Sequence, residues 1–304
     1  MKEQTEFQKA LAEMCPNVRL QANEPMARHT SFRIGGEAEV MAFPTGREEI
    51  SQLLKASRLL DRKPAILGAG TNVLAPDEGI PGLVICLKDG MDGMERLEGN
   101  CIRVAAGVTM TRAAMFAAKQ GLSGMEFAHG IPGTVGGGVY MNAGAYGGEI
   151  SGICQCVEVM DLEGEVRNFS REEMDFSYRH SRLENHPGIA LRVTFRLTPQ
   201  EPEQIMAKMK ELMAKRSASQ PLDLPSAGSA FKRPAGGYAA ALIEDAGLKG
   251  FQIGGAAISR KHAGFAVNLG GATAQDVETL LAQVSERVYE KSGIRLEPEI
   301  RVWR

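Results

Sequence analysis

The sequence predicts a protein of mixed α and β structure with two or three modest domains. Three observations carry this prediction. A strand, helix, strand order near the start is typical of a small α/β unit. Alternating apolar and polar residues in the middle predict the strands of an α+β domain. Pro199 and Pro202 then mark a boundary, because two prolines in four residues interrupt both ladders and helices. At 304 residues the chain is long for one core.

The first part of the chain contains three apolar segments of strand length and one amphipathic helix. The predicted strands are Glu39–Phe43, Pro64–Leu67 and Gly82–Leu87. Thr45 and Glu48 have the spacing of a capping box, which predicts a helix from there to about Leu60. A helix between two strands of one sheet favours parallel pairing.

The middle of the chain predicts further strands around a short helix. Cys101–Ala105 is a predicted strand and 112–119 a predicted helix. Val157–Met160 and Glu165–Phe169 flank a turn and predict a hairpin. Residues 189–197 alternate as a half-exposed strand does.

The last third predicts three helices and a final strand. The first helix carries an apolar stripe of Ile205, Met206, Met209, Leu212 and Met213. A loop is predicted at 217–228, a helix at 238–245 that ends at Gly247, and a last helix capped by Thr273. The predicted final strand, 296–303, places Glu297, Glu299 and Arg301 on one face.

Composition excludes several classes of function. The net charge of −2 gives no electrostatic support for a nucleic-acid or membrane-surface role. No apolar run approaches the ~20 residues of a membrane span. Phe7, Leu11 and Met14 lie at helical spacing within residues 1–14, which resemble neither a signal nor a transit peptide, so a cytoplasmic location is expected. The cysteines contain no Cys-x-x-Cys pair, and no histidine pair has i,i+4 spacing. We therefore expect reduced, mostly buried cysteines and no metal site.

A glycine-rich stretch from Gly130 to Ile150 is the most unusual feature of the sequence. Glu149 is its only charged residue. Glycine loses more backbone freedom on ordering than other residues, so this composition disfavours helix and strand. Successive amides without side chains are suited to contacting phosphate oxygens, and this predicts a backbone cradle for a ligand. A packed turn region between strands is the alternative.

A second stretch, Leu67 to Leu74, favours the cradle. It contains Gly68-Ala69-Gly70 after a short apolar run, which resembles the start of a dinucleotide fingerprint. That fingerprint requires a helix immediately afterwards, whereas Val73–Ala75 runs into Pro76. A Rossmann-type nucleotide site is therefore disfavoured.

Seven motifs resemble those of the UDP-N-acetylenolpyruvoylglucosamine reductase family and occur in the same order along the chain. The members of this family are flavoenzymes of bacterial wall precursor synthesis. The motifs are 29–36 (His-Thr-Ser-Phe-Arg-Ile-Gly-Gly), 67–72 (Leu-Gly-Ala-Gly-Thr-Asn), 130–137 (Gly-Ile-Pro-Gly-Thr-Val-Gly-Gly), 142–147 (Asn-Ala-Gly-Ala-Tyr-Gly), 178–181 (Tyr-Arg-His-Ser), 227–232 (Ala-Gly-Ser-Ala-Phe-Lys) and 297–301 (Glu-Pro-Glu-Ile-Arg). The resemblance covers nearly the full chain. It is to the shorter form of the family, which lacks an extra tyrosine loop.

The resemblance implies an α+β fold of three domains, with a two-part FAD cradle of the vanillyl-alcohol-oxidase (PCMH) type and a C-terminal α+β substrate domain. The expected boundaries are 1–88 for a small α/β FAD-binding subdomain, 89–200 for a second, α+β FAD-binding subdomain, and 201–304 for the substrate domain, whose last strand is free to return to the FAD site. The implied partners are non-covalent FAD, NADPH as reductant and UDP-N-acetylglucosamine enolpyruvate as substrate. We expect a monomer without nucleic-acid or membrane partners.

The resemblance also assigns residues to roles. The catalytic residues it implies are Arg179, Ser229 and Glu299. The residues it implies for the cofactor are Gly68, Ala69, Gly70, Thr71, Asn72, Gly130, Ile131, Pro132, Gly133, Thr134, Gly136, Gly137, Asn142, Gly144 and Ala145. Those it implies for substrate or phosphate are Tyr140, Tyr146, Tyr178, Arg216, Lys232 and Arg301. Arg233 departs from the family pattern, because some relatives have an amide there, so a hydrogen bond ascribed to that amide is in doubt.

Elementary chemistry is compatible with the three catalytic roles. Hydride addition to an enolpyruvyl ether pushes negative charge onto its carboxylate, so a fixed cation and an acid at that place lower the barrier. Arg179 and a protonated Glu299 suit this task. Ser229 is the expected donor of the proton to the adjacent carbon. Without the resemblance, Arg179 is interpreted as a surface ion-pair partner, Glu299 as a solvated strand residue and Ser229 as a loop hydroxyl.

Two other functions are compatible with the same features. One is a flavin enzyme that oxidises another small substrate, such as an alcohol or hydroxy acid, with oxygen as acceptor. The other is a nucleotide-binding module without chemistry, which the presence of all three catalytic motif residues disfavours. Fold alone does not separate these functions.

Overall fold

The computed structural model describes residues 4–88 and 90–304. These residues form two compact units, each built from segments that are distant in sequence. The first unit holds 4–22, 39–69, 82–88 and 90–215, and the second holds 23–38, 70–81 and 216–304. The division falls inside β1 (Arg19–Pro25), β2 (Glu37–Phe43), β5 (Ile80–Cys86) and α7 (Pro202–Ser219). The boundaries 1–88, 89–200 and 201–304 stay a prediction. Residues 1–3 of the predicted N-terminal segment and residue 89 lie outside the described residues.

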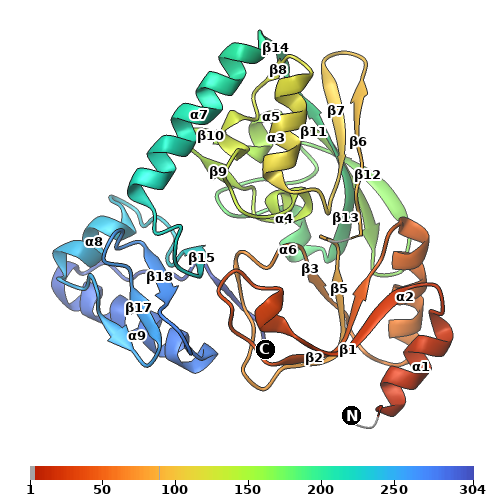
Figure 1. Cartoon of the computed structure of the whole chain (residues 1–304), viewed down its shortest axis with the longest axis horizontal. Helices are drawn as coiled ribbons and strands as arrows, with labels where there is room; N and C mark the ends of the chain where they lie inside the picture. The colour runs from red at the N-terminus through yellow and green to blue at the C-terminus, as the bar shows by residue number, and fades with distance from the viewer. Residues whose placement is uncertain (1–3, 89) are drawn as a thin grey trace. The chain divides into compact units, whose positions relative to one another are not determined.

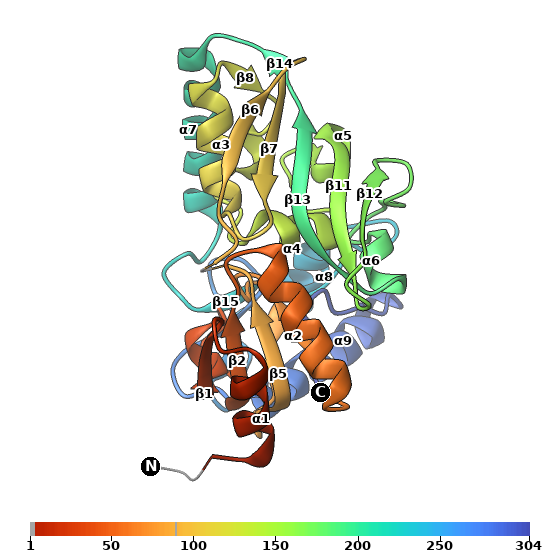
Figure 2. The ribbon, with the colours of Figure 1, turned by 90° about the vertical axis from the view of Figure 1, so that its right-hand side faces the viewer.

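The first unit contains an antiparallel sheet of five strands, in the order β12-β11-β13-β7-β6, which Figure 2 shows side by side. The strands are β6 (Met94–Leu97), β7 (Cys101–Ala105), β11 (Cys154–Asp161), β12 (Val166–Ser170) and β13 (Gly188–Arg196). The predicted hairpin is confirmed, with Val157 paired to Phe169 and Met160 to Val166. The predicted strands at 101–105 and 189–197 are also confirmed.

A second sheet has the strand order β1-β2-β5-β3. The predicted parallel pairing is confirmed between β3 (Ala65–Leu67) and β5, where Leu67 lies opposite Cys86. Two helices of the first unit contact each other, α1 (Glu6–Met14) and α2 (Arg47–Leu59). The predicted capping box at Thr45 and Glu48 is wrong. Gly46 is the N-cap, so the third helical residue is Glu49, whose carboxylate accepts from the Thr45 amide at 2.7 Å and hydroxyl at 3.0 Å.

Smaller elements complete the first unit around one apolar core. They are α3 (Met110–Lys119), β8 (Leu122–Ser123), η2 (Glu126–Ala128), α4 (Val135–Tyr140), β9 (Gly144–Ala145), β10 (Gly148–Glu149), α5 (Ile150–Ile153), α6 (Arg182–Asn185) and β14 (Thr198–Pro199). The core packs β7, β13 and α3 through residues such as Val104, Val193 and Ala114. The stripe of α7 is partly confirmed. Ile205, Met209 and Leu212 are buried, but Met206 is 40% exposed and belongs to the solvent side of the helix.

The second unit packs two helices against a four-stranded sheet in the order β15-β18-β17-β16. Its elements are η1 (Met26–Arg28), β4 (Val73–Leu74), β15 (Ser226–Ser229), α8 (Ala239–Asp245), β16 (Gln252–Ile253), β17 (Ala256–Ile258), β18 (Phe265–Asn268), α9 (Ala274–Ser292) and β19 (Arg301–Val302). Thr273 caps α9 as predicted, in a capping box with Asp276. The core contains Ile258, Val277 and Val284. Figure 1 places α8 and α9 beside β17 and β18.

Two predictions for the last third need correction. The segment 217–228 is not all loop, because α7 continues to Ser219 and β15 begins at Ser226. The final strand is only Arg301–Val302. Glu297 and Glu299 do not share one environment, since the Glu297 side chain is 70% exposed and Glu299 is 9% exposed. The chain departs from regular alternation at Pro298, which forms an isolated bridge with Phe231.

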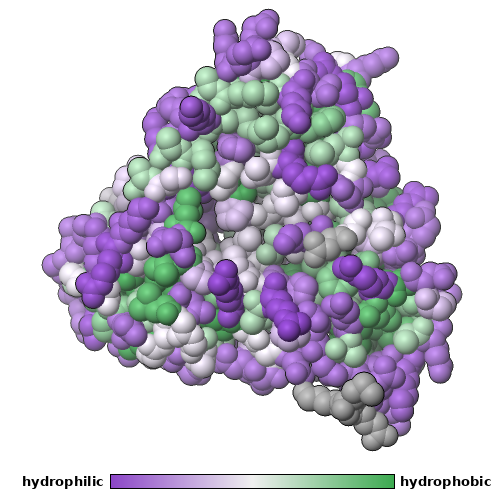
Figure 3. Space-filling model, viewed as in Figure 1, coloured by the Kyte–Doolittle hydropathy of each residue, from purple (hydrophilic) through white to green (hydrophobic). Residues whose placement is uncertain are grey.

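The surface is mixed in character. Figure 3 shows hydrophilic residues over much of one face, with apolar residues in smaller areas between them. All five cysteines are free thiols, and four of them are buried, as predicted. Among residues 4–88 and 90–304, no helix combines the length and the hydropathy needed to cross a membrane.

Candidate active site

The glycine-rich stretch contains a helix that its composition did not predict. Residues Val135–Tyr140 form α4, and the Thr134 hydroxyl caps it by accepting from the Gly137 amide at 3.3 Å. The expectation that this stretch avoids helix is therefore wrong at its centre. Tertiary packing compensates for the entropy that the glycines lose.

Close packing explains two of the three glycines in this helix. A Cβ on Gly136 would lie 2.9 Å from the Ala106 Cβ, and one on Gly138 would lie 2.9 Å from the Met110 Sδ. Real Cβ atoms do not approach that closely, so glycine is what allows α4 to lie directly against its neighbours. Gly137 differs, because the nearest atom to its Cβ would be Thr134 Oγ1 at 3.5 Å.

The two glycine stretches meet inside the first unit. A Cβ on Gly68 would lie only 2.5 Å from Thr134 Oγ1. The main chain of Gly68 therefore lies directly against the side chain of Thr134, the N-cap residue of α4. Gly70, in the second unit, has φ +60° and packs equally tightly, since its Cβ would lie 2.0 Å from the His29 carbonyl oxygen. The sequence after Gly70 enters the short strand β4 rather than a helix, as predicted.

Several amides of the Gly130 stretch already donate within the protein. The Gly130 amide donates to Thr111 Oγ1 at 3.2 Å and the Gly136 amide to the Ala106 carbonyl at 2.9 Å. Together with the bond from the Gly137 amide to Thr134, these bonds stabilise the conformation of the Gly130 stretch, so these amides are already used within the protein. Contacts to a cofactor from this segment would thus come from its other atoms and from its open surface at Gly137. Gly68, which is half-buried, and Gly137, which is exposed, are positions where the main chain has no side chain over it, and a flat, phosphate-bearing cofactor such as FAD could approach the backbone there.

Tyr146 stands at the tip of a two-residue hairpin. Ala145 in β9 pairs with Gly148 in β10, which leaves Tyr146 and Gly147 as the turn. Both have positive φ, 53° and 86°, as a type I′ turn requires. Asparagine is the usual first residue of such a turn, and tyrosine there is unfavourable. The Tyr146 side chain is 45% exposed.

Arg179 occupies a similar turn in the first unit. The amides of Ser177 and His180 each donate to the other residue's carbonyl, at 3.2 and 3.1 Å, so Tyr178 and Arg179 form the turn. Arg179 has φ +57°, which favours glycine, and its guanidinium lies 5.0 Å from the centre of the Tyr178 ring. Residues held in such a conformation concentrate at functional sites.

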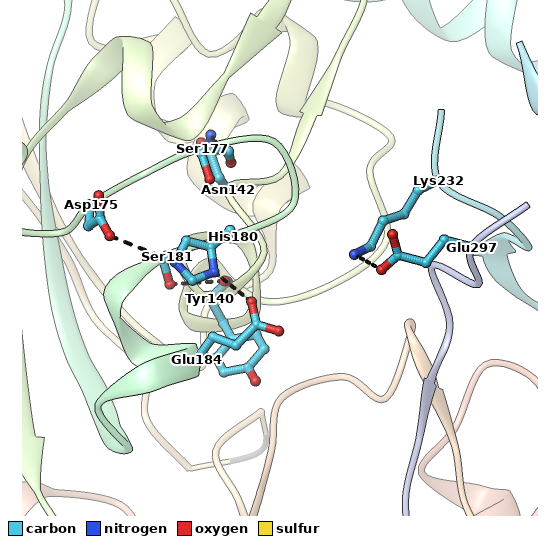
Figure 4. Close-up of polar contacts among 9 residues, drawn as sticks. All are labelled: Tyr140, Asn142, Asp175, Ser177, His180, Ser181, Glu184, Lys232 and Glu297. Carbon is cyan, nitrogen blue, oxygen red and sulfur yellow. Dashed lines mark hydrogen bonds and ion pairs between the residues drawn. The ribbon is translucent and has the colours of Figure 1, made fainter. Parts of the chain in front are cut away.

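Polar side chains surround this turn, as Figure 4 shows. The Asn142 amide nitrogen donates to the Ser177 carbonyl at 3.0 Å, and the Ser181 hydroxyl donates to the Tyr140 carbonyl at 2.9 Å. The His180 Nδ1 lies 2.6 Å from a Glu184 carboxylate oxygen. The sequence implied no role for Ser181, His180 or Glu184, although Ser181 and His180 belong to the Tyr-Arg-His-Ser motif.

Ser229 and Glu299 are brought together in the second unit by main-chain bonds. Ser229 ends β15 opposite Phe265, after a bulge at Gly228, whose φ is +77°. The next residue, Ala230, accepts the Glu299 amide through its carbonyl at 2.9 Å. The two predicted catalytic residues are therefore neighbours across a short antiparallel contact.

The predicted residues Asn72 and Arg301 lie beside this contact. The Asn72 side-chain amide donates to the Glu299 carbonyl at 3.1 Å, and the Asn72 carbonyl accepts the Arg301 amide at 2.9 Å. A Cβ on Gly228 would lie 4.0 Å from the Thr71 carbonyl oxygen. The second unit thus gathers Thr71, Asn72, Ser229, Glu299 and Arg301.

The remaining predicted residues of the second unit are engaged in their own contacts. Lys232 forms an ion pair with Glu297 (Figure 4), and their main chains also bond. Arg216 is 6% exposed and donates to Gln220 at 3.2 Å. The Arg233 guanidinium stacks 4.1 Å from the Tyr238 ring centre. Roles for these residues in substrate binding stay predictions.

Comparison with known proteins identifies the class first. Residues 38–170 match the FAD-binding domain family, and this range includes both glycine segments. The chain therefore contains the FAD-binding domain of a flavoprotein. Residues 220–303 match the family of the C-terminal domain of UDP-N-acetylenolpyruvoylglucosamine reductase.

Full-length relatives identify the particular family. UDP-N-acetylenolpyruvoylglucosamine reductase of Agathobacter rectalis is 45% identical over 97% of this chain and 98% of its own length. The enzyme of the same name from Caldanaerobacter subterraneus subsp. tengcongensis is 46% identical over 96% of each chain. The chain belongs to the UDP-N-acetylenolpyruvoylglucosamine reductase family.

A solved structure supports the same assignment. The crystal structure of UDP-N-acetylenolpyruvylglucosamine reductase from Thermus caldophilus superposes with a TM-score of 0.79 at 37% identity, covering 95% of this chain and 99% of that one. The predicted α+β flavoenzyme fold, the family and FAD as cofactor are confirmed. The individual site residues stay predictions.

Proposed function

We propose that this protein reduces the enolpyruvyl group of UDP-N-acetylglucosamine enolpyruvate to give UDP-N-acetylmuramate, a precursor of peptidoglycan. NADPH is the reductant. The observation that carries the proposal is membership of the reductase family over 97% of the chain. The meeting of Gly68 with Thr134 supports the cofactor's place in the first unit.

The chain's own groups suit the reaction. When bound, FAD supplies the hydride carrier between NADPH and the substrate. Negative charge then develops on the enolpyruvyl carboxylate, and Arg179 supplies a permanent cation to stabilise it. Its strained turn fixes the main chain from which the guanidinium extends.

Glu299 and Ser229 supply the acid functions. Glu299 is 9% exposed, which gives its carboxyl the water-poor surroundings that an acid beside a developing charge needs. Ser229 donates a proton to the carbon next to the one that receives hydride. The bond from the Glu299 amide to the carbonyl of Ala230, the residue after Ser229, holds the main chains of these two residues beside each other.

The finer details of the proposal concern partners and location. We propose that Tyr140, Tyr146, Tyr178, Arg216, Lys232 and Arg301 contact the UDP-sugar. The protein acts as a monomer in the cytoplasm, where its substrate and NADPH are available. Size-exclusion chromatography with light scattering measures the oligomeric state, and a mass near 32.7 kDa is expected.

Product analysis tests the function. With NADPH and the enolpyruvyl sugar, without oxygen, the sugar should gain two hydrogens in mass as one NADPH is consumed. UDP-N-acetylglucosamine, which lacks the enolpyruvyl group, should not respond. Hydrogen peroxide formation in air without any response to the enolpyruvyl sugar would instead identify an oxidase of another substrate.

A further inference from the structure

The backbone of Arg179 needs outside support. An arginine with φ +57° is in a conformation that side chains with a Cβ rarely adopt. The two main-chain bonds between Ser177 and His180 close the turn but do not attach it to anything else. What holds its position must come from neighbouring segments.

Asn142 attaches the first side of the turn. Its amide nitrogen donates to the Ser177 carbonyl at 3.0 Å, while its oxygen accepts the Ser151 amide at 2.9 Å. The residue is 1% exposed. Both ends of one buried side chain are thus used to join the turn to the segment after α4, and Figure 4 shows Asn142 directed at Ser177.

Ser181 attaches the other side. It is the N-cap residue of α6, where a serine hydroxyl ordinarily accepts a helix amide. Here it makes no capping bond and donates instead to the Tyr140 carbonyl at 2.9 Å. Ser181 is fully buried, at 0% exposure. The Ser181 hydroxyl therefore connects the Arg179 turn to the end of α4 instead of capping α6.

His180 adds a third restraint. Its Nδ1 lies 2.6 Å from Glu184 and its Nε2 lies 3.9 Å from Asp175. The residue that follows Arg179 is therefore held through one ring nitrogen by Glu184, while the exposed Asp175 carboxylate lies farther from the other nitrogen, again within the first unit.

We infer that Asn142 and Ser181 are positioning residues that fix Arg179 relative to the glycine-rich segment. The inference rests on the proposed function, in which Arg179 faces the substrate carboxylate. A preorganised cation stabilises developing charge without moving at the moment of reaction, and a displacement of about 1 Å costs up to ~10²-fold in rate. The bonds at Ser177 and Ser181 restrict such displacement from both sides.

Ser181→Ala tests the inference, with Ser57→Ala as a matched control. Ser57 is also 0% exposed in the first unit, and its hydroxyl also donates to a carbonyl, that of Arg62 in the loop after α2. Both variants lose one buried hydroxyl and one bond of the same kind. Only Ser181 lies beside the arginine turn.

The readout separates the two halves of the reaction. In anaerobic stopped-flow, we expect flavin reduction by NADPH to stay within twofold of wild type in both variants. We expect reoxidation by the enolpyruvyl sugar to fall by about 10–100-fold in Ser181→Ala and to stay within about twofold in Ser57→Ala. A smaller fall in Ser181→Ala, or a comparable fall in Ser57→Ala, would overturn the inference.

A second variant, Asn142→Gly, and a second method, hydrogen exchange, test the same inference without relying on turnover. Asn142 has φ +41°, so Asn142→Gly removes its side-chain bonds without backbone strain. Hydrogen exchange of the apoprotein should show faster exchange at the Ser177 and His180 amides in both Ser181→Ala and Asn142→Gly, but not in Ser57→Ala. Unchanged exchange would contradict the positioning role of Asn142 and Ser181. If wild type itself is not reoxidised by the enolpyruvyl sugar, the proposed function fails instead, and the exchange result still tests whether these two residues hold the Arg179 turn.

Discussion

The Arg179 turn and the Ser229–Glu299 contact present reactive groups in two different ways. Side chains hold the first: Asn142, Ser181 and the His180–Glu184 pair surround a strained turn. Main chain holds the second, through the Ala230 carbonyl and its neighbours. Point substitutions change side-chain bonds readily and main-chain bonds rarely. The first region should therefore be sensitive to replacement of its neighbours, and the second mainly to replacement of the reactive residues themselves.

The largest expected effect tests the main-chain region directly. Ser229→Ala removes the proposed proton donor and leaves the β15 main chain unchanged. We expect reoxidation of the reduced flavin by substrate to slow by ~10²–10⁴-fold, about 3–5 kcal/mol of barrier. Stopped-flow should show reduction by NADPH nearly intact, and the melting temperature should not change. Equal damage to both steps would assign Ser229 to structure or to flavin binding.

A smaller effect concerns the meeting of the glycine segments in the first unit. Gly68→Ala puts a Cβ 2.5 Å from Thr134 Oγ1. We expect the free energy of unfolding to fall by about 1–3 kcal/mol in denaturant titrations, because overpacking forces the N-cap of α4 to move. Gly152→Ala is the control, since its Cβ meets no atom within 4 Å. That variant should be unchanged or more stable, and equal losses in both would show that the Gly68 contact carries no special constraint.

Gly137→Ala separates fold from cofactor binding. A Cβ there has only an ordinary contact, 3.5 Å from Thr134 Oγ1, and alanine favours helix. The apoprotein should therefore gain up to about 1 kcal/mol of stability. If Gly137 contacts FAD as predicted, the added methyl group should weaken FAD affinity by about 5–100-fold. Calorimetric titration of the apoprotein measures this, and unchanged affinity would remove Gly137 from the cofactor site.

The smallest expected effect is a pH dependence in the second unit. Burial of the imidazole lowers the pKa of His262 below its usual value of 6.5. Its Nδ1 accepts the Gly264 amide at 3.1 Å, and the Gly264 carbonyl accepts the Ala230 amide. The folded state therefore favours neutral His262. Its contribution to stability is fully present above pH 6.5 and is lost as the pH falls from there through the lowered pKa.

Melting temperatures between pH 8 and pH 5 check this prediction. His262→Asn keeps an acceptor near Nδ1 but does not titrate. Below about pH 6.5, wild type should lose more stability than the variant. Parallel profiles for the two proteins would show that His262 does not supply the pH dependence.

Most of the correct sequence predictions depend on local rules, although the local capping box at Thr45 and Glu48 was wrong, and the main misses depend on packing. The absence of a helix after Gly70 followed from Pro76, and the cap at Thr273 followed from its own spacing. The helix α4 was missed because its stability comes from contacts with Ala106 and Met110, which no local pattern reveals. The exposure difference between Glu297 and Glu299 was missed because the isolated bridge at Pro298 replaces a regular strand.

For the site, motifs located the residues but not their supports. The resemblance placed Arg179 in a motif whose serine, Ser181, had no assigned task. Its task depends on the Tyr140 carbonyl, 41 residues earlier in the chain. The same holds for Ala230, whose side chain carries no chemistry and whose carbonyl joins Ser229 to Glu299. Long-range hydrogen bonds of this kind cannot be read from residue types.

Anaerobic stopped-flow of the wild-type protein, with each substrate supplied separately, tests the central claim most directly. NADPH should bleach the flavin absorbance, and the enolpyruvyl sugar alone should restore it while UDP-N-acetylglucosamine should not. Absorbance restored by oxygen but not by the enolpyruvyl sugar would contradict the account.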